Sequence, residues 1–441
     1  MNVALVKPTT DHAASDIFAA ARGRLPGKGP VAEVREAAFA EFAQRGLPHR
    51  RIEEWKYTDL RVLLREVAPL AARPDADALK RASEALAQIE VKGGCRLVLV
   101  DGAFAPELSD LGALEKGVDV RTLHDMLESA DNAARADLLR TNATTDVMVS
   151  LNAAMATDGV VIGVADDAVL TKPLHIVHVT TQPSASSFTR SLLQIGKGAR
   201  VTLVESFVAA KGAHGYQVND AVVLWAGEEA DVQHVRLVED ARDASNISTA
   251  IVTLNGRTQY NTFSLTTGSV LSRYQAFVRF GGEGANASIN GVNLLKDQQH
   301  GDATLVVDHT VPHCQSREIF RAVVDDRAHS VFQGKIIVQP DAQKTDGKMM
   351  TRALLLSDGA EADNKPELEI FADDVTCGHG ATVGALDESL LFYLRARGLS
   401  EKEAQALLIQ AFIGEAIESI ADDGVREIVI GAGERWLAAR G

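Results

Sequence analysis

The sequence contains few cysteines, and no two of them are close together. The three thiols, Cys95, Cys314 and Cys377, are far apart among 441 residues, and no CxxC occurs. Because their number is odd and their spacing is wide, we expect neither a disulfide framework nor a closed zinc site. Sparse cysteines of this kind are typical of a reducing compartment, so we expect the protein in the cytoplasm.

The sequence also lacks long apolar runs and an excess of basic residues. No stretch approaches the roughly 18 apolar residues that span a bilayer, and the first residues show no apolar segment behind a basic one, so a secretion signal is not expected. The formal net charge is -15 at pH 7, which argues against a nucleic-acid binder, since phosphate binding requires a basic face. We therefore expect no membrane and no nucleic-acid partner, whereas protein partners are compatible with this charge.

The motifs of ATPases and of common hydrolases are missing as well. The sequence has no GxxxxGK[ST] loop, no GxSxG and no HExxH. Residues 378–384 (GHGATVG) are similar to GxGxxG, but Val383 occupies the place of the third glycine. We therefore expect a chain that is not an enzyme by itself, so any ATP-driven work requires another protein.

A repeat is present in the middle of the chain. Turns marked by Gly198, Gly227, Gly256 and Gly284 follow one another at almost equal intervals, with β-rich runs between them. Each interval is long enough for about two strands. A near-constant period favours a β-solenoid, in which a coil buries its apolar face only by stacking on its neighbours. A β-sandwich with evenly spaced turns is the alternative.

Helical patterns flank this repeat. Residues 31–45 and 121–139 are predicted to be helical, and residues 96–102 form a short buried strand and turn. We predict an N-terminal helical domain with a short strand at residues 1–140, and a β-rich core at residues 141–385.

A C-terminal helical domain is predicted for residues 386–441. Residues 387–397 are amphipathic, and Ser400 with Glu403 forms a capping box that begins the next helix. An open solenoid end exposes unpaired strand edges. These helices are one means of covering it.

Cys377 and His379 are the strongest candidates for metal ligands. In an extended strand their side chains point to the same side, roughly 6.6 Å apart along the strand. A thiolate and an imidazole suit iron, zinc or copper, but two ligands do not complete a site. The alternative, which spacing alone favours, is a buried thiol beside a hydrogen-bonded histidine.

A second group contains Asp308, His309, His313 and Cys314. His313 and Cys314 are adjacent, so in a strand they point to opposite faces and do not easily share one metal. We expect a structural role for this group. We also expect a structural role for Cys95, because it adjoins an apolar strand.

Several segments together resemble the SufB/SufD family of iron–sulfur cluster assembly proteins. They are residues 54–58 (EWKYT), 330–346 (SVFQGKIIVQPDAQKTD), 364–375 (NKPELEIFADDV), 377–384 (CGHGATVG) and 390–398 (LLFYLRARG). The resemblance implies a mainly β fold, with a right-handed parallel β-helix core flanked by helical N- and C-terminal domains. This agrees with the solenoid pattern.

The same resemblance implies a function. It implies a scaffold subunit of the SUF assembly complex that pairs with SufB through the β-helices and docks the SufC ATPase on its C-terminal helices. It further implies that Cys377 and His379 contribute to iron acquisition and nascent cluster assembly at the SufB interface. No cofactor is expected to stay bound to the chain alone, while iron or a nascent cluster, and also reduced flavin, are expected in the complex. A homodimer of the isolated chain is a further expectation.

Two alternatives to this function stay open. Residues 204–208 (VESFV) lack the cysteine that SufB has at the similar place, which favours the SufD branch over a SufB-like primary cluster scaffold. A β-helix enzyme acting on polysaccharide is the alternative from another class, because this fold also hosts lyases and hydrolases. The absence of a secretion signal argues against it.

Overall fold

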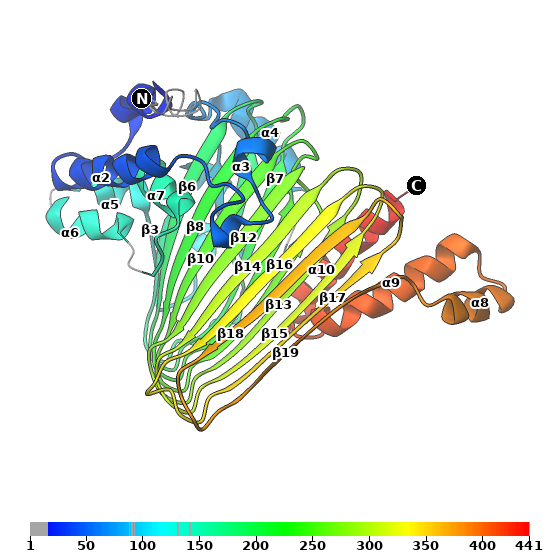
Figure 1. Ribbon diagram of the computed structural model, residues 1–441. Coiled ribbons are helices and arrows are strands. Elements are labelled where there is room, and N and C mark those ends of the chain that lie inside the picture. Colours follow the sequence, from blue (N-terminus) through cyan, green and yellow to red (C-terminus); the bar gives the residue numbers. More distant parts are fainter. Residues whose placement is uncertain are drawn as a thin grey trace, which may run out of the picture.

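The computed structural model describes residues 16–440, except residues 88, 90, 92, 130, 131, 141 and 142. Residues 1–15, on which the expectation of no secretion signal rests, lie outside this part. Within it, no helix is both long and apolar enough to cross a membrane. The chain forms a long β-solenoid with helices at both ends of the sequence (Figure 1).

The solenoid consists of two facing sheets, because each coil contributes one strand to each sheet. The nine-stranded sheet contains β3 (Val118–Thr122), β4 (Val160–Val164), β6 (Ser186–Ile195), β8 (Gln217–Ala226), β10 (Ser245–Leu254), β12 (Leu271–Phe280), β14 (His300–His309), β16 (His329–Val338) and β18 (Glu361–Ile370). The ten-stranded sheet contains β1 (Cys95–Val100), β2 (Ala103–Phe104), β5 (Leu174–Thr180), β7 (Arg200–Ala209), β9 (Asp231–Glu239), β11 (Gln259–Thr266), β13 (Asn286–Leu295), β15 (Gln315–Val324), β17 (Asp346–Leu355) and β19 (Thr376–Gly384).

Successive coils pair in parallel, so the predicted parallel β-helix is confirmed. From β4 to β19 each strand bonds to the strand of the next coil, and the antiparallel pairs β1–β2 and β3–β4 lie at the beginning of the stack. The predicted turns recur at one corner of the coils. Gly198 and Gly284 adopt φ angles of 64° and 71° there, and a Cβ at Gly227 would lie 2.7 Å from the backbone nitrogen of Lys197 in the preceding coil. Glycine adopts a positive φ without strain, although Glu229 and Arg257 adopt similar angles at the same corner of other coils.

The helices are α2 (Pro30–Arg45), α3 (Leu60–Leu63), α4 (Ala76–Leu86), α5 (Leu123–Glu128), α6 (Asn132–Ala136), α7 (Val147–Met155), α8 (Glu388–Ala396), α9 (Glu401–Ile417) and α10 (Asp423–Ala438). Short 3-10 turns occupy Arg22–Arg24, Glu53–Trp55, Pro106–Leu108, Leu111–Ala113 and Asp137–Leu139. The capping box at Ser400 and Glu403 is present, and α8 begins and ends close to the predicted positions. The helices that flank the β-helix are therefore confirmed.

Two N-terminal elements differ from the prediction. The segment that follows residue 146, expected to be β-rich, forms α7, and all but one of the residues of α7 are buried. A short apolar run without periodicity does not distinguish a buried helix from a buried strand. The second difference is at Arg121, which lies in β3, so the helical segment begins only at α5.

The segment with the sequence EWKYT is anchored to the solenoid by a buried ion pair. Arg273 on β12 and Asp302 on β14 form this pair, and both side chains are fully buried. The Arg273 guanidinium lies 3.8 Å from the centre of the Trp55 ring and donates to the carbonyl oxygen of Glu54 at 2.7 Å. The hydroxyl of Thr58 donates to Asp302. Side chains of two neighbouring coils thus hold the EWKYT segment, which is distant from them in the sequence.

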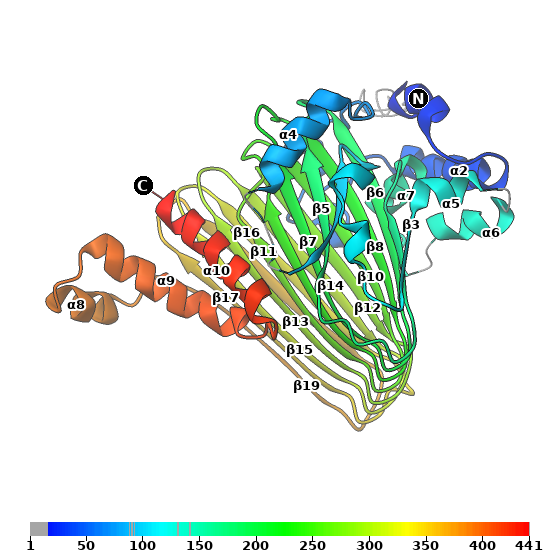
Figure 2. The same ribbon diagram turned by 180° about the vertical axis from the view of Figure 1, so that it is seen from behind.

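Helices α9 and α10 pack on the outer face of the ten-stranded sheet (Figure 2). Apolar side chains of α9 and α10, such as Ile413 and Trp436, share a cluster with Phe263 and Leu265 of β11. The expectation that these helices cover the last coil is wrong, because no residue of β18 or β19 is buried. The end of the solenoid is therefore an exposed edge.

The buried ion pair gives a stability prediction. In Arg273→Ala, Asp302 is left as a buried charge without its counterion, and we expect the free energy of unfolding to fall by about 3–5 kcal/mol. The matched control is Arg257→Ala, whose partners Glu228 and Glu229 are on the surface, with an expected loss below about 1 kcal/mol. Chemical denaturation followed by circular dichroism measures both. Equal losses in the two variants would contradict this account.

Candidate functional site

The two candidate ligands lie on β19, the last strand of the ten-stranded sheet. Cys377 is paired with Gly347 of β17, and His379 is paired with Met349. β19 has a neighbour on one side only. Cys377 is half-buried and packs against the interior core, whereas His379 is exposed. Because residues two apart share a side of a strand, both side chains lie at the open end of the interior.

The surroundings of Cys377 favour a protonated thiol. Burial raises the pKa of the Cys377 thiol, the N–H of Gly347 acts against this, and the Asp346 carboxylate adds to it. Gly347 also leaves space in the coil beneath, since a Cβ there would lie 3.4 Å from the Ser316 hydroxyl oxygen. A thiol of this kind becomes a thiolate when a metal replaces its proton.

Two buried polar residues lie in the preceding coils: Glu318, which the sequence did not single out, and His309, which belongs to the second predicted group. Glu318 is two coils from His379 in the same column of the sheet, with Met349 between them. Its carboxyl group lacks a well-aligned hydrogen bond within the described residues, although the Ser316 hydroxyl is near, and burial raises its pKa to about 8. His309, at 3.1 Å from that hydroxyl, has a pKa lowered to about 4 by burial. Polar groups therefore continue from the open end into the interior.

The alternation of residues along β15 indicates that Glu318 points into the interior. Ser316, Glu318 and Phe320 alternate with outward residues, and all three are buried. The signal becomes visible only once the strand and its inward side are known.

The structure does not bring the second predicted group together in a single site. The Cys314 side chain is fully buried, with its sulfur 3.5 Å from the carbonyl oxygen of Gly282. His313 lies in the turn before β15 with φ of 61°, and Asp308 accepts a hydrogen bond from Gln339. Cys95 is buried, and its sulfur lies 3.4 Å from the carbonyl oxygen of Asp110. These contacts agree with structural roles.

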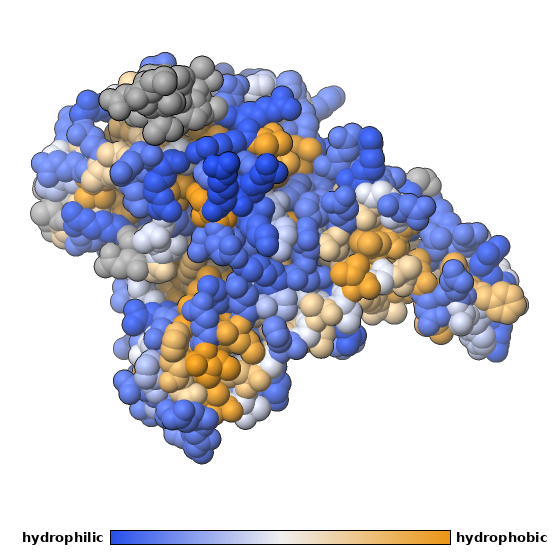
Figure 3. Space-filling view, viewed as in Figure 1, coloured by the Kyte–Doolittle hydropathy of each residue, from blue (hydrophilic) through white to orange (hydrophobic). Residues whose placement is uncertain are grey.

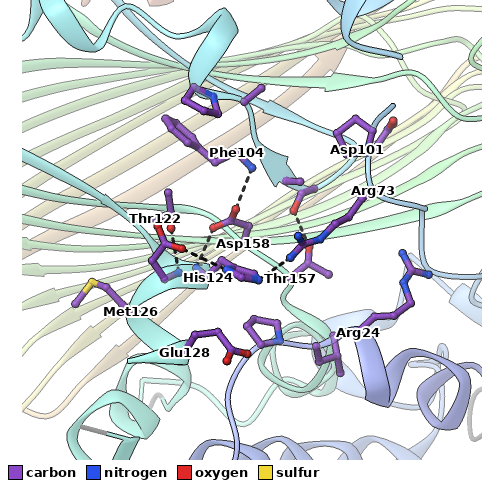
Figure 4. Close-up of a pocket in the computed structure, with 18 of the residues that line it drawn as sticks. Arg24, Arg73, Asp101, Phe104, Thr122, His124, Met126, Glu128, Thr157 and Asp158 are labelled. Carbon is purple, nitrogen blue, oxygen red and sulfur yellow. Dashed lines mark hydrogen bonds and ion pairs between the residues drawn. The ribbon is translucent and has the colours of Figure 1, made fainter. Parts of the chain in front are cut away.

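A large hollow, of about 1200 Å³, lies between the N-terminal segments and the first coils (Figure 4). Several of its polar side chains are bonded to the chain itself. Arg73 lies 2.6 Å from Nε2 of His124, and the Asp158 carboxylate accepts the backbone N–H groups of Phe104 and His124 at 2.9 and 3.0 Å. These contacts favour a role in joining the N-terminal segments to the solenoid.

Thiol labelling tests the environment of Cys377. In the native chain we expect iodoacetamide to modify Cys377 before Cys95 and Cys314, which are buried. Near neutral pH the reaction should be slower than for the same residue in the unfolded chain, because a raised pKa leaves less thiolate, and it should accelerate as the pH rises. Mass spectrometry of peptides measures each site, with Cys377→Ser as the control. Faster labelling in the native chain would show that the thiolate is already stabilised.

Comparison with known proteins identifies the family of this fold. The family model "SUF system FeS cluster assembly, SufBD core domain" matches residues 178–412, and the model "SufBD protein N-terminal region" matches residues 27–176. The iron–sulfur cluster assembly protein SufD of Escherichia coli is 30% identical over 400 residues, which are 88% of this chain and 89% of that protein. An iron–sulfur cluster assembly SufBD family protein of Synechocystis is 30% identical over 397 residues, which are 88% of this chain and 86% of the relative. The chain therefore belongs to the SufBD family of the SUF iron–sulfur cluster assembly system.

Proposed function

We propose that the chain is a non-catalytic scaffold subunit of the SUF complex, and that it provides half of a cluster-assembly site. The observation that carries this proposal is the pair Cys377 and His379 on a last strand with one free side. A thiolate and an imidazole are suitable ligands for iron and for iron–sulfur clusters. Because two ligands are too few to hold a cluster, a partner must supply the rest, and the cluster is a cargo that stays only transiently.

The exposed edge of the solenoid supports the pairing with SufB. Unpaired N–H and C=O groups of an edge strand bind another strand readily. Large apolar side chains are exposed beside this edge, at Ile370, Phe371 and Val383, and Figure 3 shows apolar surface over the corner of the coils and between the solenoid and α9. A partner with a similar end is able to bury these side chains and to bring its own ligands close to Cys377 and His379.

The C-terminal helices support the docking of the SufC ATPase. While α9 and α10 pack on the sheet, α8 projects from the body of the molecule (Figures 1 and 2). Three of its apolar side chains are exposed: Leu390, Phe392 and Tyr393. An apolar patch on a projecting helix is typical of a binding surface. The chain has no nucleotide motif of its own, so an ATPase bound there would supply the energy.

Other expectations of the family resemblance are not tested by the fold. Reduced flavin in the complex, iron acquisition, the cytoplasmic location and a homodimer of the isolated chain stay predictions. Membership in the SufBD family argues against the polysaccharide-active alternative.

Reconstitution of the complex tests the half-site. Cys377→Ala and His379→Ala remove exposed or half-buried side chains, so folding and complex yield should be unchanged. Cluster formation should fall to a small fraction of that of the original complex, because the shared site loses a ligand. The measurement is cluster absorbance per assembled complex, and His214→Ala, an exposed histidine in a remote turn, is the matched control. Normal cluster yield from the double variant would contradict the proposed half-site.

A binding measurement tests the role of α8. Phe392→Asp places a charge on the exposed patch, and we expect the affinity for SufC to fall by about 2 kcal/mol or more, which is roughly 30-fold in Kd. Phe392 is 74% exposed, so the fold should not change. The control, Val169→Asp, alters a side chain that is 60% exposed on an early coil. If both variants bind SufC equally well, α8 is not the docking surface.

A further inference from the structure

A group of ionisable side chains lies inside the solenoid, many coils away from β19. It consists of His178 on β5, Glu205 on β7 and Asp220 on β8. All three are buried. Glu205 shares its side of β7 with Leu203, and Asp220 shares its side of β8 with Val222, and both of these apolar residues belong to the interior core. The group therefore joins the two sheets across the interior.

The three side chains direct ligand atoms toward a common point. One such atom from each lies within 4.8 Å of the other two, and among the residues that the structure describes this is the one group of three histidine, cysteine or acidic side chains with that geometry. Nε2 of His178 is 3.9 Å from Oδ1 of Asp220, which is too long for a hydrogen bond. Two ligands that are each about 2.1 Å from one ion lie about 3.0–4.2 Å apart, so this separation suits a shared ion.

Two polar atoms of this group have no hydrogen-bond partner within the described part of the chain. Nε2 of His178 and Oε1 of Glu205 are shielded from solvent and have no hydrogen-bond partner among the described residues. Leaving buried polar atoms unpaired is costly, and such atoms require an explanation. A bound ion satisfies both at once.

Further contacts hold the same three side chains in place. Thr189 donates to Oδ1 of Asp220 at 2.5 Å, and Oε2 of Glu205 is 2.8 Å from Nε2 of His234. The His178 ring stacks on Phe207, with ring centres 4.3 Å apart. Outer contacts of this kind orient the ligands of metal sites.

The charges around the group also favour a cation. Glu205 and Asp220 bring two carboxyl groups into the interior, and the guanidinium groups of Arg236 and Arg190 lie near them. Arg236 donates instead to Asn246 and Ser248, the first at 3.0 Å, and lies over the rings of Phe207 and Tyr274. Among the described residues, neither guanidinium forms an ion pair with Glu205 or Asp220, so direct contact with a cation is open to a bound ion.

We propose that His178, Glu205 and Asp220 bind one divalent transition-metal ion inside the solenoid. One imidazole nitrogen and two carboxylate oxygens suit Fe²⁺, Mn²⁺ or Zn²⁺, and the absence of a thiolate from this group disfavours Cu⁺. Since β5 and β7 belong to one sheet and β8 belongs to the other, the ion links the two sheets early in the stack. This site is independent of the proposed half-site at Cys377 and His379.

Metal content of the refolded full chain tests the proposal. The chain is unfolded with a chelator, refolded with excess Zn²⁺ or Mn²⁺, desalted and analysed by mass spectrometry for metal per chain. We expect about one equivalent in the original chain and in the double variant Cys377→Ala and His379→Ala, with a higher melting temperature than after refolding without metal. Asp220→Asn should lose the ion and the increase in melting temperature.

The controls separate the possible outcomes. His178→Gln is a second ligand variant, and circular dichroism shows whether each variant folds. Co²⁺ in place of Zn²⁺ gives an absorption spectrum that reports on nitrogen and oxygen ligands. Less than about one-tenth of an equivalent in the refolded original chain would overturn the proposal, as would an ion that both ligand variants retain. An ion that is lost only with Cys377 and His379 would belong to the half-site and would also overturn it.

Discussion

Parallel pairing between successive coils is the constraint on which the rest of the structure depends. A coil of this solenoid has two strands and cannot bury its own apolar side chains, so each coil is stabilised by the one before it and the one after it. The beginning of the stack satisfies this requirement with the antiparallel strands β2 and β3 and with helices. On the last two strands, β18 and β19, no residue is buried. The same rule that builds the molecule therefore leaves one exposed edge, where we propose that a partner binds.

The repeat of the fold could be predicted because its signals are local. The evenly spaced glycine turns and the capping box at Ser400 both depend on residues that are close in sequence. The position of α9 and α10 could not be predicted in this way. It depends on an apolar outer face of the ten-stranded sheet, to which β9, β11 and β13 each contribute a part. The apolar run of α7 was misassigned because a fully buried segment has no periodicity to read.

The candidate site was partly predictable for the same reason. Cys377 and His379 are two residues apart, so the period of a strand is enough to place them on one side. Ser316 and Glu318 lie on β15, whereas His309 lies on β14 of the other sheet, so their proximity follows from the turn that joins these two strands. The group of His178, Glu205 and Asp220 requires more, because its members come from three strands in both sheets. No spacing in the sequence shows that two strands face one another across an interior.

The interior polar groups differ in how completely the fold satisfies them. At Asp302 every charge has a partner within the chain, since Arg273, Thr58 and Trp55 surround or extend the ion pair. At His178 and Glu205 some of the polar atoms are held by neighbours, while Nε2 of the first and Oε1 of the second are not. Cys377 and His379 lie at the open end of the solenoid, where their strand, β19, has a neighbouring strand on one side only. A buried polar group whose atoms are all paired costs little, whereas unpaired buried atoms are costly unless something else completes them. In this solenoid the incomplete groups are therefore the places where we propose binding from outside the chain, of an ion in the interior and of a protein at the end.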